Sequence, residues 1–386
     1  MADRNTGRIA LILIGLIVSA ATSFTPNWAM ADRSSAAGGD PMERYANVPA
    51  IEWVTKIKKR RGMGRGLYQF STPVVADDRL YVGSAGGRVV CVELRLGKRL
   101  WSIDTEGPVV GPLRLAGEQL YFGDAKGILY AVQAADGSPI WRVDLGGEVM
   151  AAPLVVGTAV YAVTMHGELV SVDRATGARK WRTARRVSAA QFTVKGMSNP
   201  ALLDGGRIAI GYPDGVIAVH DAVHGTLMWE QRLSAPAAMT QDVETTPLPL
   251  DGLLVVGTID GIVAALDGRD GDVVWKAELG TPNDLAVADG IIYAAGSGRV
   301  AAIDGRRGQV LWTTRLPVGE TSAPAVVGEA LFVTSLTDRV YLLDRRTGAM
   351  LGKRHLGSGS YGHPVAAGDR VYVITNHGNL VALKVP

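Results

Sequence analysis

The sequence has a single cysteine, Cys91, among its 386 residues. No disulfide can therefore form within the chain, so noncovalent packing must hold the fold together. An excess of charge of one sign is also lacking, because 40 Lys and Arg residues face 37 Asp and Glu residues. The net charge of +3 does not indicate a nucleic-acid partner, which would require a clustered basic face.

Long hydrophobic runs are absent after the first 31 residues. The N-terminus carries Arg4 and Arg8, then an apolar run over residues 9–21 and small residues at 29–31, which is typical of a secretory signal peptide cleaved after Ala31. The apolar run, about 13 residues, is shorter than the ~20 that a membrane helix needs. We expect a signal peptide at residues 1–31, a flexible segment at residues 32–50 and an exported protein.

Groups of residues typical of catalysis or metal binding are missing as well. No Gly-rich loop joins a strand to a helix, and no Gly-x-Ser-x-Gly turn stands in the context of a nucleophile elbow. The six histidines are scattered, and His220 takes an apolar strand position, which favours a core histidine over a metal ligand. We therefore expect a protein that is not an enzyme, with no catalytic residues, no cofactor and no metal.

Glycine and tryptophan, in contrast, recur at a fixed spacing. Seven glycines each stand four residues before an equivalent position; six of those positions are tryptophan and the seventh is Gly352. The mean period is about 42 residues, which is typical of four-stranded propeller blades. The glycines are Gly97, Gly137, Gly177, Gly225, Gly271, Gly308 and Gly348, and the tryptophans are Trp101, Trp141, Trp181, Trp229, Trp275 and Trp312.

Each repeat is predicted to contain four short strands. The glycine supplies a positive φ in the hairpin before the fourth strand, and an Asp such as Asp173 can cap that hairpin as an Asx turn. Strands such as residues 262–266 are apolar at consecutive positions, which indicates that neighbouring blades cover both faces of the sheet. We interpret the recurring tryptophan as packing between blades, and Cys91 as the small buried residue of its strand.

Eight first strands can be counted, but the eighth repeat ends at Leu383 without a fourth strand. Residues 51–54 at the other end of the chain contain the required tryptophan, Trp53. We therefore predict an all-β, eight-bladed β-propeller of four-stranded antiparallel blades over residues 51–386. Its N-terminal strand would complete the last blade and close the ring. We expect a monomer.

Three insertions lengthen connections between a fourth strand and the next first strand. The second and third, residues 185–196 and 234–244, leave adjacent repeats and should lie together on one face, where insertions usually mark the binding side of a repeat protein. They would place an apolar and basic group beside an acidic pair, which suits a protein partner. The alternative is two solvated loops with a locally buried Phe. The predicted partner-binding residues are Phe192, Val194, Lys195, Asp242 and Glu244.

The first insertion contains basic residues among glycines, between Lys56 and Arg65. An anionic surface, whether lipid headgroups or nucleic acid, could bind there, although a solvated charge run is the more common outcome. Because it lies half a ring away from the other insertions, we interpret it as a separate feature.

The Gly turn followed by Trp resembles the repeat of pyrroloquinoline-quinone-type propellers, over nearly the whole sequence after residue 31. Within that group the chain resembles the BamB family, which are periplasmic propellers of the machinery that folds barrels into the bacterial outer membrane. Three segments carry this resemblance: residues 192–196 (FTVKG), 242–247 (DVETTP) and 278–284 (ELGTPND).

The resemblance implies a non-catalytic periplasmic scaffold, at the inner face of the outer membrane, that binds the POTRA domains of the barrel-inserting subunit BamA. It also implies contact with other BAM subunits and, as a further candidate, with nascent outer-membrane proteins. The positions that match the family's contact segments are again Phe192, Val194, Lys195, Asp242 and Glu244.

The sequence departs from this family at one point. Members are typically lipoproteins anchored through a cysteine just after the signal, and no cysteine occurs near this N-terminus. We therefore expect only peripheral or indirect membrane contact, with the protein held by its partner. Two other functions remain open: a pyrroloquinoline-quinone-dependent dehydrogenase, suggested by the repeat type, and an exported propeller that binds another protein or ligand.

Overall fold

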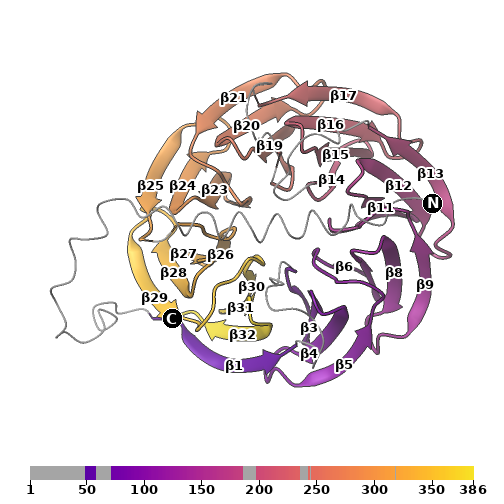
Figure 1. Cartoon of the computed structure of the whole chain (residues 1–386). Helices are drawn as coiled ribbons and strands as arrows, with labels where there is room; N and C mark the ends of the chain where they lie inside the picture. Colours follow the sequence, from indigo (N-terminus) through magenta and orange to yellow (C-terminus); the bar gives the residue numbers. More distant parts are fainter. Residues whose placement is uncertain (1–47, 58–70, 186–196, 235–241, 244, 318) are drawn as a thin grey trace, which may run out of the picture.

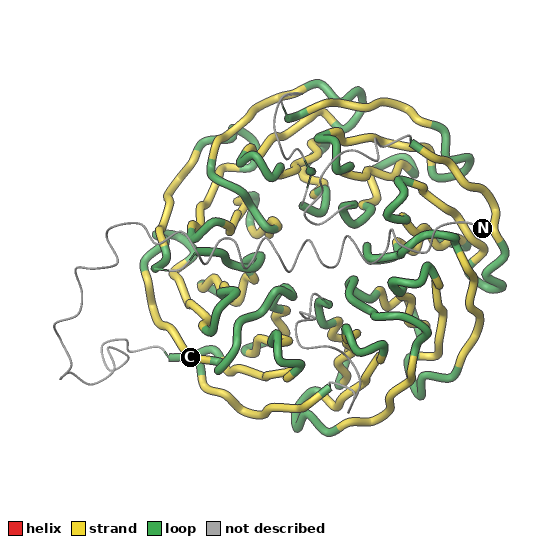
Figure 2. Tube along the Cα trace, viewed as in Figure 1, coloured by secondary structure: helices red, strands yellow, loops and turns green. Residues whose placement is uncertain are grey.

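The computed structural model describes residues 48–57, 71–185, 197–234, 242–243, 245–317 and 319–386. Within these ranges the secondary structure consists of 32 β-strands in eight four-stranded sheets, without a helix. The sheets form a ring, each with its first strand near the centre and its fourth strand at the rim (Figure 1, Figure 2). The prediction of an all-β, eight-bladed propeller is confirmed.

Blades 1 to 7 follow the chain with four consecutive strands each. Blade 1 contains β2 (Val74–Ala76), β3 (Arg79–Ser84), β4 (Arg88–Glu93) and β5 (Arg99–Asp104). Blade 2 contains β6 (Arg114–Ala116), β7 (Gln119–Gly123), β8 (Ile128–Gln133) and β9 (Pro139–Asp144). Blade 3 contains β10 (Leu154–Val156), β11 (Ala159–Val163), β12 (Glu168–Asp173) and β13 (Arg179–Ala184). Blade 4 contains β14 (Ala201–Leu203), β15 (Arg207–Gly211), β16 (Val216–Asp221) and β17 (Leu227–Arg232).

The second half of the ring repeats this arrangement. Blade 5 contains β18 (Leu248–Leu250), β19 (Leu253–Gly257), β20 (Ile262–Asp267) and β21 (Val273–Glu278). Blade 6 contains β22 (Asp284–Ala288), β23 (Ile291–Gly296), β24 (Arg299–Asp304) and β25 (Val310–Arg315). Blade 7 contains β26 (Ala325–Val327), β27 (Ala330–Thr334), β28 (Arg339–Asp344) and β29 (Met350–His355). Blade 8 contains β30 (Val365–Ala367), β31 (Arg370–Ile374), β32 (Asn379–Lys384) and, from the other end of the chain, β1 (Ala50–Lys56).

Blade 8 closes the ring by joining the two ends of the described chain. β1 pairs antiparallel with β32, from Ala50 opposite Lys384 to Lys56 opposite Asn379. The Arg370 guanidinium donates two hydrogen bonds to the Glu52 carboxylate, with N···O distances of 2.6 and 3.1 Å. The N-terminal strand thus completes the last blade as predicted, and it covers an edge of β32 that would otherwise be unpaired.

The recurring tryptophans pack between blades, as predicted. At Gly97, which has a φ of 65°, a Cβ atom would lie 2.5 Å from the Trp53 ring of the preceding blade, so no side chain fits there. Several indole N–H groups also donate to a backbone carbonyl of the next blade, as Trp312 does to Arg345 at 3.1 Å. The seven contacts of this kind are Trp53–Gly97, Trp101–Gly137, Trp141–Gly177, Trp181–Gly225, Trp229–Gly271, Trp275–Gly308 and Trp312–Gly348.

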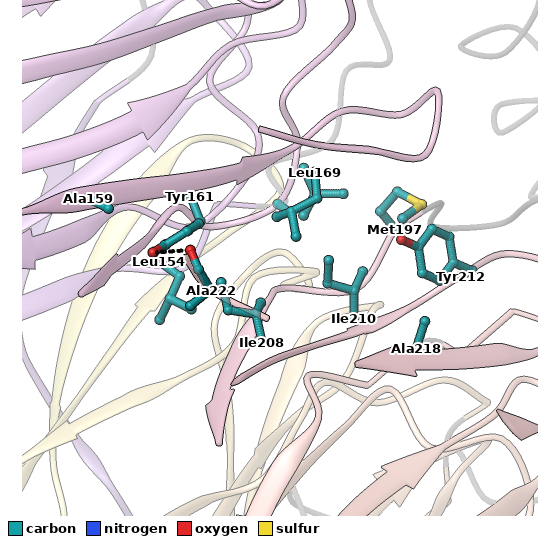
Figure 3. Close-up of a cluster of buried hydrophobic side chains, with 12 residues drawn as sticks. Leu154, Ala159, Tyr161, Leu169, Met197, Ile208, Ile210, Tyr212, Ala218 and Ala222 are labelled. Carbon is teal, nitrogen blue, oxygen red and sulfur yellow. Dashed lines mark hydrogen bonds between the residues drawn. The ribbon is translucent and has the colours of Figure 1, made fainter. Parts of the chain in front are cut away.

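The core lies between neighbouring blades rather than within one blade. Figure 3 shows the cluster between blades 3 and 4, where Leu169 of β12 faces Ile208 and Ile210 of β15. In the same cluster the Tyr161 hydroxyl donates to the Ala222 carbonyl at 2.9 Å. Because each sheet has such a cluster on both faces, the inner strands are apolar at consecutive positions rather than alternating.

Cys91 is one of the small residues that stand opposite a tryptophan. It is fully buried in β4 and lies across from Trp101 in β5. Burial raises the pKa of the Cys91 thiol to about 11. The thiol is therefore protonated at neutral pH, which agrees with the structural role predicted for it.

Candidate partner-binding site

The second insertion begins with an arginine that is held on blade 4. Arg185 follows β13, and its guanidinium lies 2.6 Å from the Asp214 carboxylate and 2.9 Å from the Glu230 carboxylate. Its Cζ atom also lies 4.9 Å from the centre of the Tyr212 ring. Burial alone would lower the pKa of Arg185, but the hydrogen bonds that its guanidinium donates to both carboxylates outweigh that effect and raise the pKa. The start of the insertion is thus fixed by charge-assisted hydrogen bonds and a cation–π contact.

The same insertion returns to the fold beside Tyr212. Met197 is 9% exposed and belongs to the cluster between blades 3 and 4 (Figure 3). The next residue, Ser198, is buried and exchanges two hydrogen bonds with Gly211, one through its hydroxyl at 2.7 Å and one through its N–H at 3.1 Å. Both ends of the second insertion are therefore anchored on blade 4.

The third insertion is anchored at the same turn. Before it, the Leu233 N–H donates to the Gly215 carbonyl at 2.8 Å. After it, the Val243 N–H donates to the Tyr212 carbonyl at 3.1 Å, and the Val243 side chain is buried between blades 4 and 5. The β15–β16 turn, residues 212–215, thus contacts residues from both insertions.

This turn brings together the ends of the two insertions, as the sequence predicts for connections that leave adjacent blades. Of the five predicted contact residues, Phe192, Val194, Lys195 and Glu244 lie outside the described residues. Their contact with a partner stays a prediction.

Asp242 is the one predicted contact residue that the structure places, and its side chain is fully buried. Its carbonyl accepts a hydrogen bond from the Ile259 N–H at 2.9 Å, and the next residue, Val243, forms a β-bridge with Thr258. Because Val243 must reach the core between blades 4 and 5, the preceding residue is drawn inside with it. Asp242 is thus inside the fold, whereas the sequence prediction placed it on the binding surface.

The basic insertion lies between blades 8 and 1. Its first basic residue, Lys56, is exposed at the end of β1, and the following Ile57 is buried and donates to the Gly378 carbonyl at 3.0 Å. The remaining basic residues up to Arg65 lie outside the described residues, so an anionic ligand there stays a prediction.

A polar network near the centre of the ring was not predicted. The Asn199 amide donates to the Thr246 hydroxyl at 2.9 Å, and the Thr246 N–H donates to the Asp284 carboxylate at 2.9 Å. The same carboxylate lies 3.4 Å from Nδ1 of His363, whose backbone N–H donates to the Thr72 hydroxyl at 3.2 Å. These residues stand at the start of blades 4, 5, 6, 8 and 1. The sequence contained a clue to the network, because four of the five residues come directly before the proline of a first strand.

The described residues contain no group of three or more His, Cys, Asp or Glu side chains that could hold a metal ion. His220 is a core histidine, as predicted: it is 3% exposed and its Nδ1 lies 3.2 Å from the Gly225 carbonyl. Burial lowers the pKa of His220, so the neutral ring is favoured. In the described ranges, no helix has the length and apolar character needed to cross a membrane.

Fold and site together define an eight-bladed β-propeller in which described ends of the second and third insertions meet at the β15–β16 turn. The family model described as outer membrane protein assembly factor BamB matches residues 50–132, 115–236 and 193–385, which is nearly all of the propeller. The chain belongs to the family of outer membrane protein assembly factor BamB. The family resemblance stated from the sequence is confirmed.

Solved structures share the fold. BamB from Moraxella catarrhalis is similar with a TM-score of 0.75 at 22% identity, over 87% of this chain and 100% of that chain. Quinohemoprotein alcohol dehydrogenase from Comamonas testosteroni is similar with a TM-score of 0.69 at 14% identity, over 87% of this chain and 76% of that chain. The computationally designed Ika8 protein gives a TM-score of 0.68 at 15% identity, over 82% and 96% of the two chains. No curated protein matches the sequence.

Proposed function

We propose that this protein is a non-catalytic scaffold of the outer-membrane β-barrel assembly machinery and that it binds the POTRA domains of BamA in the periplasm. Membership of the BamB family supports this class of partner. The observation that carries the proposal is the meeting of two insertions at the β15–β16 turn, residues 212–215, where Tyr212 contacts both Arg185 and Val243. Export after cleavage at Ala31 belongs to the same proposal.

The turn gives the two loops a fixed base. Arg185 is bound by two carboxylates at one end, and buried Val243 holds the other loop at its return. A fixed base reduces the entropy that binding would otherwise cost, because fewer conformations are lost on contact. We propose that Phe192 and Val194 supply the apolar contact and that Lys195 and Glu244 supply the charges, while buried Asp242 supports the loop from below.

The first prediction concerns this contact. Replacing Phe192 with Ala and Glu244 with Lys should abolish co-purification with BamA, because removing a central aromatic anchor at an interface typically costs more than about 2 kcal/mol. The measurement is the amount of BamA retained by the tagged protein from detergent-solubilised envelopes.

The matched control is Glu118→Lys, which reverses an exposed carboxylate in the β6–β7 turn of blade 2. In each blade this turn lies at the opposite end of the strands from the insertions, so the control should retain BamA. Equal retention by the double variant and the wild type would show that the contact lies elsewhere.

A second surface supports contact with nascent barrel proteins. The rim strands of blades 4, 5 and 6 carry neighbouring exposed apolar residues, including Met228 at 52%, Val274 at 52% and Leu311 at 48% exposure. Such edge strands can pair with an extended segment through backbone hydrogen bonds while the apolar side chains cover its alternate residues. We include nascent outer-membrane proteins among the proposed partners for this reason.

The dehydrogenase alternative is supported by the fold alone. The quinohemoprotein shares 14% identity with this chain, which extends the likeness no further than the propeller. The scaffold is supported by the family match over residues 50–385 as well as by the fold. It is therefore the function that we propose.

A further inference from the structure

One arginine lies in the innermost part of the ring. The eight first strands contain two charged residues, Arg114 in β6 and Asp284 in β22. In the other seven blades the position of Arg114, identified by its pairing with the second strand, holds valine, leucine or alanine. These residues are Val74, Leu154, Ala201, Leu248, Ala286, Ala325 and Val365. The repeat therefore does not require an arginine at this position.

The Arg114 guanidinium has few partners within the protein. Its Nε–H donates to the Pro153 carbonyl of blade 3 at 3.2 Å. Over the ranges that the structure describes, no carboxylate forms an ion pair with Arg114, whereas Arg345 is held by Asp289 and Glu329. Arg114 is exposed to solvent, yet the protein around it still desolvates the guanidinium and lowers its pKa. Its Nη1 and Nη2 groups are thus able to bind a ligand.

Other polar groups surround the same axis. The Ala152 N–H, which stands next to Pro153, donates to the Asn199 side-chain oxygen at 2.7 Å. From Asn199 the polar network near the centre of the ring continues through blades 5, 6 and 8 to Thr72 of blade 1. Together with Arg114 of blade 2, seven of the eight blades contribute a polar group near the axis.

Solvent has access to the centre of the ring. Leu202 belongs to the first strand of blade 4 and is 41% exposed. The His363 side chain, which belongs to the polar network, is 28% exposed. Because propeller blades surround a central channel, these exposures indicate that a small molecule can reach Arg114 and the polar network from solvent.

The cost of Arg114 favours a ligand over a purely structural role. A cation that loses part of its hydration without gaining a counter-ion destabilises the fold. Residues that break a local pattern at such a cost are expected at functional sites. A carboxylate or phosphate group compensates the charge, because its oxygens can accept two parallel N–H bonds from a guanidinium.

We propose that Arg114 forms an anion-binding site in the central channel and that the ligand is a small molecule with a carboxylate or phosphate group. The Nη1 and Nη2 groups of Arg114 bind the oxygens of that group. The polar network provides hydrogen-bonding groups for the rest of the ligand. The inference does not rest on the proposed BamA contact, and its test does not involve BamA.

The variant Arg114→Leu tests the site. It should fold, because blades 3 and 5 carry Leu154 and Leu248 at the same position. Backbone amide NMR shifts are followed while inorganic phosphate or, in a separate titration, acetate is added at constant ionic strength. The wild type should bind at least one of these anions saturably, and Arg114→Leu should bind it at least about tenfold more weakly, since charge-assisted hydrogen bonds are lost.

The matched control is Arg307→Leu, which removes an arginine whose side chain is 79% exposed on a hairpin of blade 6. This variant should bind the anion as tightly as the wild type. The anion that binds more tightly identifies the ligand group as a phosphate or a carboxylate. Equal binding by the wild type and Arg114→Leu, or no saturable binding of either anion, would overturn the proposal.

Thermal unfolding separates a binding role of Arg114 from a structural one. Without added anion, Arg114→Leu should unfold at the same temperature as the wild type or at a higher one, because an uncompensated cation is gone. The bound anion should raise the unfolding midpoint of the wild type and of Arg307→Leu, but not that of Arg114→Leu. A lower midpoint of Arg114→Leu without added anion would assign Arg114 to the fold and contradict the site.

Discussion

At the residue scale, the fold rests on the pairing of a large side chain with a glycine. The sequence places Gly97 four residues before Trp101, but these two residues do not form the contact; Gly97 receives Trp53 of the preceding blade, and Trp101 packs on Gly137 of the next. The spacing of the glycines and tryptophans revealed the repeat period and the packing role of both residue types. Which glycine each tryptophan contacts could be assigned only from the closed ring, because the contact joins residues about 40 positions apart.

Trp229 departs from this pattern and gives a prediction. Its indole N–H is buried without a hydrogen-bond partner among the described residues, and the Gly268 carbonyl in the equivalent acceptor position accepts from the Arg207 guanidinium instead. The Trp141 indole, in contrast, donates to the Arg174 carbonyl at 2.9 Å. Trp141→Phe should therefore lower the free energy of unfolding by about 1 kcal/mol more than Trp229→Phe, since only the former loses a hydrogen bond.

Urea unfolding of the two variants followed by circular dichroism measures this difference. Both substitutions remove the same atoms from a ring that packs on a hairpin glycine, so the loss of packing is matched. A loss from Trp229→Phe as large as that from Trp141→Phe would contradict the role given to the indole N–H.

At the scale of the element, several of the hairpins between a third and a fourth strand are each capped by an aspartate. The Asp344 carboxylate accepts hydrogen bonds from the Thr347 N–H at 2.8 Å, the Thr347 hydroxyl at 2.9 Å and the Arg346 N–H at 3.0 Å. Asp173 is arranged in the same way, so the Asx turn predicted from the sequence is confirmed. Local hairpin chemistry was predictable because it depends on residues within a few positions of one another.

These caps predict a loss of stability in acid. The Thr347 N–H and hydroxyl bonds lower the pKa of Asp344, and bonds from Lys180 and then Thr176 lower the pKa of Asp173. A carboxyl whose pKa is lower in the folded state stabilises the fold above its unfolded pKa, about 3.9. That stabilisation is lost as pH falls through the folded-state pKa values.

Thermal unfolding midpoints measured between about pH 5 and pH 2.5 should therefore fall as the pH is lowered. In a variant with Asp173→Asn and Asp344→Asn, the midpoint should change less over this range, because two of the titrating caps are gone. An unchanged pH dependence in the variant would mean that other carboxylates account for the acid response.

At the scale of the whole molecule, the ring brings together residues that the sequence keeps apart. The network of Asn199, Thr246, Asp284 and His363 joins blades 4, 5, 6 and 8. No local pattern in the sequence showed that these side chains lie within contact distance of one another. The burial of Asp242 could not be predicted either, because it follows from how Val243 enters the space between blades 4 and 5. Periodicity predicted the number of blades and the closure; contacts between non-equivalent residues of different blades required the structure.

Ring closure leads to the last prediction. A chain of residues 48–386 keeps β1, whereas a chain of residues 58–386 leaves the outer edge of β32 unpaired and removes the Glu52 partner of Arg370. An unpaired strand in the last blade can pair with another molecule, so the shorter chain should form dimers or larger species and unfold at a lower temperature. Light scattering after size exclusion and a thermal melt measure both effects. The 48–386 chain, which keeps the pairing of β1 with β32, should stay monomeric; if the 58–386 chain were equally monomeric and equally stable, β1 would not be what closes the ring.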